Sequence, residues 1–408
     1  MTASPARRAA FGILLATETR GAYADELLHG DRLERLSAAD RGLAEELTMG
    51  VLRRRGELDD AIEQVVRRPL TKLDQEVLCA LRIGAYQLLR LDRVPAHAAV
   101  SESVELVKAA GKRSASGLTN AALRKIGKLS SSAVDEQENV PDWLRVRWRD
   151  RFGDEATRAI VEASLRAPEK FLRLNPQFDR EETITQLKME SIELCETEVS
   201  GAYRVVAGRT RDSQTVMSRR ASVQDVGSQA VVALLALRPG MRMLDVCAAP
   251  GGKAQAASER LGAGSVVACD LHPHRLRKMR ALGARSVKLV ATDSAQALRA
   301  EVRFDRVLVD APCSGTGTLG RNPEIKWRLQ PRDLEDLAGR QAALLCAALG
   351  RVAEGGALVY STCSLEGEEN EQVVARAAGP EWRIEERLER IPGRDAGDGF
   401  WAVRLVRV

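Results

Sequence analysis

The chain lacks long hydrophobic runs. No apolar segment approaches the roughly 20 residues that a helix needs to cross a bilayer. Residues 1–20 also lack the small-residue cleavage pattern of a secretory signal peptide. We therefore expect a cytoplasmic protein that has no membrane partner.

Motifs for metal binding and for a disulfide framework are missing as well. The seven cysteines are scattered, odd in number and never spaced as Cys-x-x-Cys. The four histidines do not pair with them, and His272 and His274 lie too close to Asp270 to indicate more than loop packing. We expect neither a disulfide scaffold nor a metal site.

A large charge excess is also absent, since 62 basic residues face 57 acidic ones and leave a net charge of +5. Any surface for a polyanion must therefore arise from local clustering. No internal repeat or low-complexity tract is present. The 408 residues, with 44% hydrophobic and 29% charged, indicate a globular chain of two or three domains.

The N-terminal third has helical periodicity. Apolar residues recur three and four positions apart between residues 6 and 129, as in Leu43, Leu47 and Val51. This spacing predicts a helical bundle over residues 1–130. Residues 131–140 have no apolar period and are rich in small and acidic residues, which is typical of a linker.

The rest of the chain mixes helices with strands. Residues 141–222 combine an arginine-rich helix with short alternating segments such as Phe171–Leu174, and they predict a small α+β subdomain. In residues 223–408, short apolar strands alternate with helical stretches. This order predicts a doubly wound, largely parallel, Rossmann-like sheet.

A glycine turn follows the first strand of this sheet, in the sequence from Leu244 to Lys253. It is not a Walker A loop, because Lys253 is followed by Ala254, and it is not G-x-G-x-x-G, because Gly251 and Gly252 are adjacent. Nucleotide-like ligands bind at the carboxyl end of such strands. The segment therefore predicts a cofactor loop and disfavours a dehydrogenase.

Acidic residues end the next two predicted strands. Asp270 can accept hydrogen bonds from the ribose hydroxyls of an adenosine, and Asp293 can accept one from its adenine amino group. An acid at such a place is also common as a helix N-cap. Their occurrence in succession favours the ligand role.

Two cysteines follow later strands, Cys313 after Asp310 and Cys363 after Thr362. Methylation at carbon 5 of cytosine needs a thiolate that adds to carbon 6, an acid near ring nitrogen 3, and a base that removes the carbon 5 proton. A lone cysteine in this position is more often a small buried hydrophobe. Two cysteines at one sheet edge, together with Asp310, favour the thiol chemistry.

The segments 310–317 and 360–364 resemble the two cysteine motifs of the NOL/NOP2/Sun family of RNA (cytosine-5) methyltransferases. Within that family the chain resembles the bacterial Sun/Fmu branch, which methylates a cytosine in 16S ribosomal RNA. The likeness extends to residues 224–229, 321–327 and 397–401 and is weakest between 150 and 220.

The resemblance implies a NusB-like helical domain that binds RNA, a second RNA-binding element in the α+β subdomain and a class I methyltransferase domain. It also implies that Cys363 is the nucleophile, that Cys313 assists product release and that Asp310 contacts the base. The contacts implied for S-adenosylmethionine are Cys247, Ala248, Ala249, Pro250, Gly251, Gly252, Lys253, Asp270, Asp293 and Asp310. Asp293 departs from relatives, where a glycine commonly follows the acid.

For RNA, the sequence offers two arginine clusters, Arg53–Arg55 and Arg145–Arg151, although cations at helix ends also complement the helix dipole. We predict that Lys326 and Trp327 line the path of the extruded cytosine into the pocket. We expect a monomer whose partner is 16S ribosomal RNA.

Three alternatives remain open. An adenine-amino or protein methyltransferase shares the sheet but usually carries Asn-Pro-Pro-Tyr where this chain has Asp310–Cys313. An RNA-binding assembly or antitermination factor with an inert Rossmann-like domain would fail to bind S-adenosylmethionine. A dehydrogenase, disfavoured by the glycine spacing, would bind a nicotinamide cofactor.

Overall fold

The computed structural model describes residues 2–129, 136–281, 287–292, 298–299 and 301–408. The chain forms two compact units. Unit 1 comprises Met1–Ala167 together with Leu319–Leu329, a segment that we call the strap. Unit 2 comprises Pro168–Thr318 and Gln330–Val408. These units divide the chain differently from the four predicted segments, because residues 142–165 and the strap both group with the N-terminal helices.

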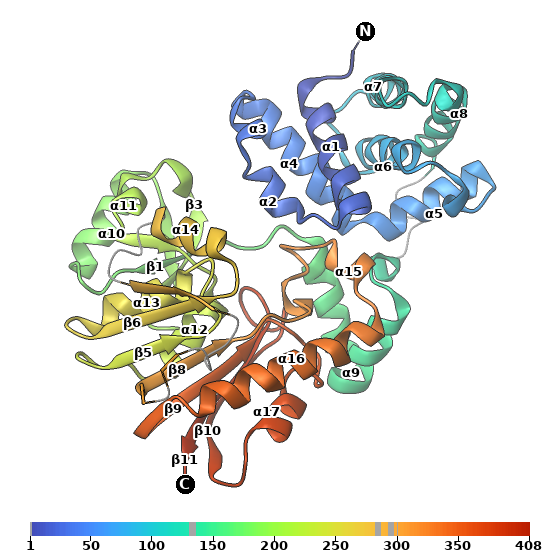
Figure 1. Ribbon diagram of the computed structural model, residues 1–408. Coiled ribbons are helices and arrows are strands. Elements are labelled where there is room, and N and C mark those ends of the chain that lie inside the picture. Colours follow the sequence, from blue (N-terminus) through green and yellow to red (C-terminus); the bar gives the residue numbers. More distant parts are fainter. Residues whose placement is uncertain (1, 130–135, 282–286, 293–297, 300) are drawn as a thin grey trace. The chain divides into compact units, whose positions relative to one another are not determined.

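Unit 1 is helical throughout its described residues, apart from loops (Figure 1). Its α-helices are α1 (Pro5–Arg20), α2 (Ala24–Leu28), α3 (Asp31–Glu34), α4 (Ala38–Arg53), α5 (Arg55–Val66), α6 (Gln75–Arg90), α7 (Ala96–Ala109), α8 (Ser116–Ile126), α9 (Asp142–Leu165) and, in the strap, α15 (Ile325–Arg328).

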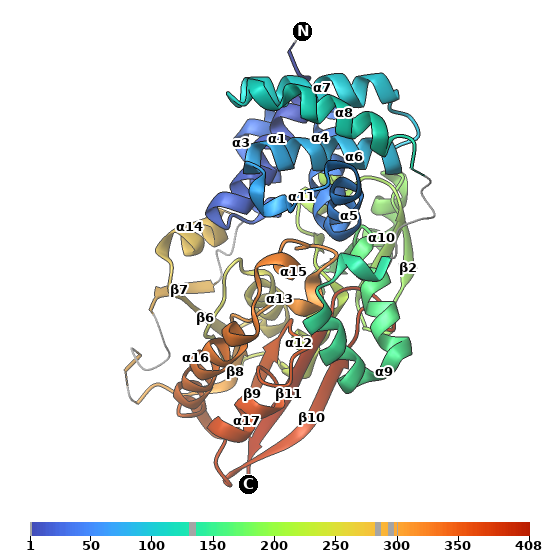
Figure 2. The ribbon, with the colours of Figure 1, turned by 90° about the vertical axis from the view of Figure 1, so that its right-hand side faces the viewer.

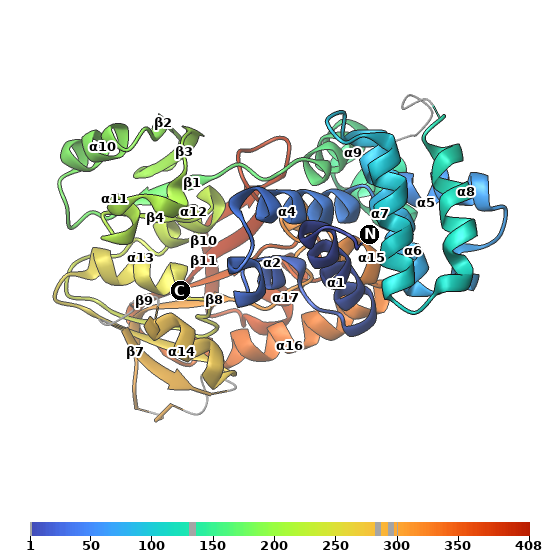
Figure 3. The same cartoon turned by 90° about the horizontal axis from the view of Figure 1, so that it is seen from above.

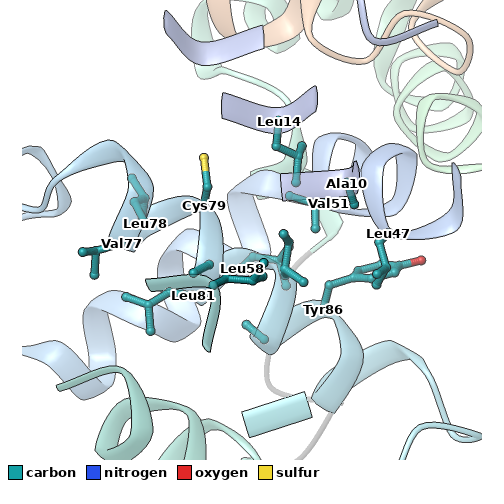
Figure 4. Packing of buried hydrophobic residues seen from close by; sticks show 14 of the residues in the cluster. Ala10, Leu14, Leu47, Val51, Leu58, Val77, Leu78, Cys79, Leu81 and Tyr86 are labelled. Atoms are coloured by element: carbon teal, nitrogen blue, oxygen red, sulfur yellow. The ribbon is translucent and has the colours of Figure 1, made fainter. Parts of the chain in front are cut away.

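The core of unit 1 gathers around α4 and α6. Leu47 and Val51 lie four residues apart and are both buried, so the spacing seen in the sequence marks the inner face of α4. They pack in one cluster with Leu14 of α1 and Leu81 of α6 (Figure 4). Ser37 begins α4, because its side chain accepts a hydrogen bond from the backbone N–H of Asp40.

Unit 2 contains two sheets and the helices that cover them. Its strands are β1 (Phe171–Leu174), β2 (Glu193–Glu196), β3 (Ala202–Ala207), β4 (Ala221–Val223), β5 (Arg242–Asp245), β6 (Ser265–Asp270), β7 (Val287–Ala291), β8 (Phe304–Asp310), β9 (Val352–Thr362), β10 (Trp382–Arg390) and β11 (Phe400–Arg407). Its helices are α10 (Arg180–Met189), α11 (Gln214–Met217), α12 (Val226–Leu234), α13 (Gly252–Leu261), α14 (Pro273–Ala281), α16 (Pro331–Leu349) and α17 (Glu371–Ala377).

The larger sheet has the order β10-β11-β9-β8-β5-β6-β7 in the described part of the chain. The strands from β9 to β7 in this order pair in parallel, whereas β11 and β10 are antiparallel additions at one edge. This confirms the predicted Rossmann-like class. The parallel strands place their carboxyl ends at a common edge.

Helices cover both faces of this sheet. Met243 and Leu244 are consecutive residues of β5 that belong to different hydrophobic clusters, as alternation along a strand requires. The cluster of Met243 includes residues of α12, α13 and α14, and that of Leu244 includes residues of α16 and α17. Figure 2 shows α16 and α17 over one face, in front of β8 and β9.

The smaller sheet is antiparallel, with the order β2-β3-β1-β4 among the described residues. Its core contains Leu172 of β1, Leu187 of α10 and Tyr203 of β3. In Figure 3 these strands gather with α10 and α11 beside the larger sheet. An α+β element is thus present, and α9 groups by its contacts with unit 1.

Candidate active site

The carboxyl edge of the parallel strands carries most of the residues predicted to be functional. Asp245 ends β5, Asp270 ends β6 and Asp310 ends β8, while Cys363 directly follows β9. These strands are neighbours in the sheet. Their parallel direction brings the three acids and the thiol to one edge, which the sequence predicted for Asp270, Asp310 and Cys363.

The loop after β5 turns sharply before α13 begins at Gly252. Gly251 has a φ of 108°, and a Cβ atom built there would lie 2.9 Å from the Cε of Met279. Both the positive φ and the close side chain require glycine. The loop is also fixed by the Arg275 side chain, which donates to the carbonyl of Ala249 at 3.0 Å.

Asp270 connects the loop after β5 to the loop after β6 through hydrogen bonds. Its Oδ2 accepts from the backbone N–H of Ala249 at 3.2 Å, and its Oδ1 accepts from that of His272 at 2.9 Å. The side chain is buried, and Arg275 lies 3.5 Å from it. A carboxylate oxygen can accept a further bond. Asp270 therefore organises the loops and also lines the cavity described below.

Asp310 has two fixed partners. Lys253 donates to its Oδ2 at 2.7 Å and Ser361 donates to its Oδ1 at 2.8 Å. Burial alone would lower the pKa of Lys253, but the negative charges around it, led by Asp310, outweigh burial and raise the pKa. Lys253 is therefore an ammonium group that holds a proton beside the Asp310 carboxylate.

Asp245 is buried with incomplete compensation of its charge. It is 1% exposed, and neither carboxylate oxygen has a hydrogen-bond partner among the described residues. Burial, and after it the charge of Asp310, raises the pKa of Asp245 to about 8. A buried carboxyl group without a partner is costly. The sequence did not single out this residue.

The two predicted thiols lie together. The Sγ atoms of Cys313 and Cys363 are 3.3 Å apart, and both residues are half-buried. The hydrogen bond to Cys363, together with burial, raises the pKa of Cys313 well above its ordinary value. A thiol with a raised pKa gives a more basic thiolate once it is deprotonated.

A cavity of about 710 Å³ joins the loop, the acids and the thiols. Its volume is in the range of small-molecule sites. Its lining is Val246, Cys247, Ala249, Asp270, Leu271, His272, Arg275, Thr292, Asp310, Ala311, Pro312, Cys313, Arg340, Ala343, Leu344, Ala347 and Cys363. The sequence did not single out Thr292, after β7, or Arg340, on α16, because neither belongs to a motif; His272, which was interpreted as loop packing, also lines the cavity.

Lys326 and Trp327, predicted to line the path of the cytosine, do not line this cavity. Asp293 lies outside the described residues. Lys326 and Trp327 belong to the strap in unit 1 and are absent from the cavity lining. Lys326 has no exposed surface; its Nζ donates to the carbonyl of Arg53 at 2.8 Å, and burial lowers its pKa to about 7. The indole of Trp327 donates to the carbonyl of Leu52 at 3.2 Å.

The first arginine cluster predicted for RNA also has structural contacts. Arg53 donates to the carbonyl of Gly320. Arg54 donates to the carboxylate of Glu57, and Arg55 donates to that of Glu18. In the second cluster, on α9, Arg149 is exposed. A surface cavity of about 470 Å³ is lined there by Asp142, Arg145, Val146, Arg149, Asp154, Thr157 and Arg158.

Within the described ranges, no group of three or more histidine, cysteine, aspartate or glutamate side chains is arranged to hold a metal ion. Nor is any helix of those residues both long and apolar enough to cross a membrane.

Three segments match known protein families. Residues 232–405 match the family described as 16S rRNA methyltransferase RsmB/F, and residues 4–128 match the NusB family. Residues 140–203 match the ferredoxin-like domain of RsmF/B-like methyltransferases.

Similar proteins extend over nearly the whole chain. A protein of Synechocystis named probable ribosomal RNA small subunit methyltransferase B is 35% identical, with 93% of this chain and 91% of that protein covered. A Bacillus subtilis protein of the same name is 32% identical, with coverage of 92% and 88%. The solved structure of a protein named PH0851 has a TM-score of 0.82 at 24% identity and covers 100% of both chains, which shows a shared fold.

Proposed function

Because the chain belongs to the RsmB/F family of 16S rRNA methyltransferases, we propose that it methylates carbon 5 of a cytosine in 16S ribosomal RNA with Cys363 as the covalent nucleophile. The observation that carries this proposal is the pair of thiols 3.3 Å apart in one cavity with Asp270 and Asp310. Two thiols have no purpose in methylation of an amino group, which is already nucleophilic.

The residues of the cavity fit S-adenosylmethionine, which would supply an electrophilic methyl group. Ala249 of this loop lines the cavity, and the buried Asp270 presents acceptors suited to ribose hydroxyls. Asp245, buried and without a partner, fits the vicinity of a cationic ligand. Asp293, proposed for the adenine amino group, completes this set.

The residues around the two thiols would each carry out a different step of the reaction. The Cys363 thiolate would add to carbon 6 of the cytosine, which makes carbon 5 nucleophilic. Asp310 would face ring nitrogen 3, and the proton held by Lys253, 2.7 Å away, would stabilise the charge that develops there. Cys313 would act as the base in its thiolate form: after losing its own proton to solvent it would take the carbon 5 proton, so that Cys363 can leave.

The RNA must present an unstacked cytosine, because carbon 6 is shielded inside a helix. Phosphate contacts from local arginine clusters would supply affinity. Helix α9, with Arg149 exposed and with Arg145 and Arg158 around the same surface cavity, supports such a contact. A contact between RNA and Lys326 would require the strap to leave the helices of unit 1, since that side chain is fully buried.

The test uses unmodified small-subunit RNA and methyl-labelled S-adenosylmethionine, followed by digestion and identification of the labelled nucleoside. We expect label in 5-methylcytidine with the wild type and none with Cys363→Ser. With Cys313→Ser we expect a trapped protein–RNA adduct, because the base for release is lost.

Cys346→Ser is the matched control, since that cysteine is exposed and lies outside the cavity; it should methylate like the wild type. RNA binding without label, in free RNA and in assembled subunits, would indicate an RNA-binding scaffold and overturn the proposal. Label in another nucleoside would refute the thiol mechanism alone.

A further inference from the structure

A buried carboxylate lies behind the two thiols. Glu369, in the loop between β9 and α17, is fully buried and does not line the cavity. Its Oε1 accepts from the backbone N–H of Ser314 at 2.8 Å and from the side-chain amide of Gln341 at 2.9 Å. Its Oε2 accepts from the hydroxyl of Ser364 at 2.5 Å and also from the hydroxyl of Ser314.

Each serine in this network directly follows one of the cysteines in the chain. Ser314 follows Cys313 and Ser364 follows Cys363, and the two hydroxyl oxygens are 3.0 Å apart. One carboxylate that does not line the cavity therefore binds both cysteine loops. Gln341 of α16 extends the network, since its amide also donates to the carbonyl of Pro312 at 2.9 Å.

The carboxylate accepts hydrogen bonds from four donors on three separate segments, so each oxygen has two. Burial raises the pKa of Glu369, and the hydrogen bonds of the two serines and Gln341 act in the opposite direction. No part of the group faces the cavity, so it does not touch a substrate. Its contacts are those of a residue that sets the position of others.

We propose that Glu369 is a positioning residue that fixes the spacing between the thiols of Cys313 and Cys363. A fixed spacing matters because both sulfur atoms must reach one base, and displacement by about 1 Å can cost orders of magnitude in rate. The catalytic consequence rests on the proposed function. The spacing itself does not, and it can be measured without RNA.

The experiment measures how readily the two thiols couple in the full chain. Hydrogen peroxide oxidises one thiol to a sulfenic acid and releases a water molecule; the second thiol attacks that sulfur, which forms the S–S bond and releases a second water. The two thiols are oxidised and the peroxide is reduced. The disulfide between Cys313 and Cys363 is quantified over time by mass spectrometry of the linked peptides.

Glu369→Gln is the decisive variant. Glutamine has the same shape but carries an NH2 donor where the carboxylate accepts, so at least one of the donors from the cysteine loops or α16 loses its acceptor. We expect coupling to be slowed roughly tenfold or more. Alkylation of each cysteine by iodoacetamide, measured separately, should keep its rate, because the cavity stays open to solvent.

Glu354→Gln is the matched control, since Glu354 is exposed on β9, and it should couple like the wild type. Ser364→Ala removes one arm of the network and provides the test if Glu369→Gln does not fold. Coupling at the wild-type rate in a folded Glu369→Gln or Ser364→Ala protein overturns the proposal.

Methylation assays distinguish a failure of this inference from a failure of the proposed function. If the wild type methylates cytosine, Glu369→Gln should lower kcat while the KM for S-adenosylmethionine stays the same, because the cofactor side of the cavity is not changed. If the wild type does not methylate RNA at all, the proposed function fails. The coupling rates still decide whether Glu369 sets the spacing of the thiols.

Discussion

At the scale of single residues, Asp245 is costly to the folded protein because its carboxyl group is buried and its charge is incompletely compensated. Its pKa is about 8 in the folded protein, against about 4 for an aspartate in an unfolded chain. Between these values the folded state keeps a proton that the unfolded state has lost. The free energy of unfolding therefore falls as the pH rises from about 4 to about 8.

We predict that Asp245→Asn removes this dependence, because asparagine does not titrate. In the absence of cofactor, the variant should gain stability relative to the wild type as the pH rises, by up to about 1.4 kcal/mol for each pKa unit of the shift. Urea unfolding at pH 5 and pH 8 measures the difference. Asp336→Asn on the exposed side of α16 is the control, and equal pH dependence of wild type and Asp245→Asn contradicts the prediction.

The sequence predicted which residues lie at the cavity edge, but it did not predict the hydrogen bonds that hold them in place. Asp270, Asp310 and Cys363 follow from strand ends, because β-strands with apolar character are visible in the chain. Glu369 could not be found in this way. It stands in the polar run Glu366–Glu371, which is typical of an exposed turn, and only the packing of two distant loops buries it.

At the scale of elements, the strap has contacts that a short-range pattern does not reveal. Its helix α15 has four residues, too few for a periodic signal, so the prediction that Lys326 and Trp327 line the path of the cytosine had no local structure to support it. Their polar atoms bind backbone carbonyls at the end of α4. Contacts between residues about 270 positions apart are not visible in local sequence.

Strand β10 was missed for a different reason. It carries many charged residues and most of its side chains are exposed or half-buried, as is common for an edge strand. It lacks the apolar run that identified β5, β6, β8 and β9. The edge hairpin of β10 and β11 therefore did not appear in the prediction of a largely parallel sheet.

We predict that Arg53→Lys loosens the strap. The guanidinium of Arg53 donates twice to the carbonyl of Gly320, from Nε at 3.0 Å and from an Nη atom at 2.9 Å, and lysine cannot reproduce this fork. The loss should be about 1 kcal/mol in the stability of unit 1. Thermal unfolding measures it, and calorimetric titration should show unchanged affinity for S-adenosylmethionine.

Arg8→Lys is the control for this substitution, since Arg8 is exposed on α1. It should leave the thermal transition where it is. A loss of cofactor affinity in Arg53→Lys would mean that the strap supports the cavity, contrary to its place in unit 1.

At the scale of the whole molecule, the chain crosses from one unit to the other more than once. It leaves unit 2 after Thr318, contributes the strap to unit 1, and returns at Gln330. The strap begins six residues after Cys313 but packs with helices from the start of the chain. Neighbours in sequence thus belong to different units. This arrangement can be tested by measuring how a ligand changes hydrogen exchange in each unit.

Hydrogen exchange with and without S-adenosylmethionine provides that test. A ligand at 100 times its Kd stabilises the body that binds it by about 2.7 kcal/mol, which slows exchange about 100-fold for amides that open with that body. If the cofactor binds in the cavity of unit 2, amides of β8 should gain this protection. Those of the strap, such as the N–H of Leu329 bound to the carbonyl of Ile325, should exchange as before, together with those of α4. Equal protection of the strap and β8 would instead show that the strap opens with unit 2. Exchange follows the unit in which an amide is held, rather than the position of that amide along the chain.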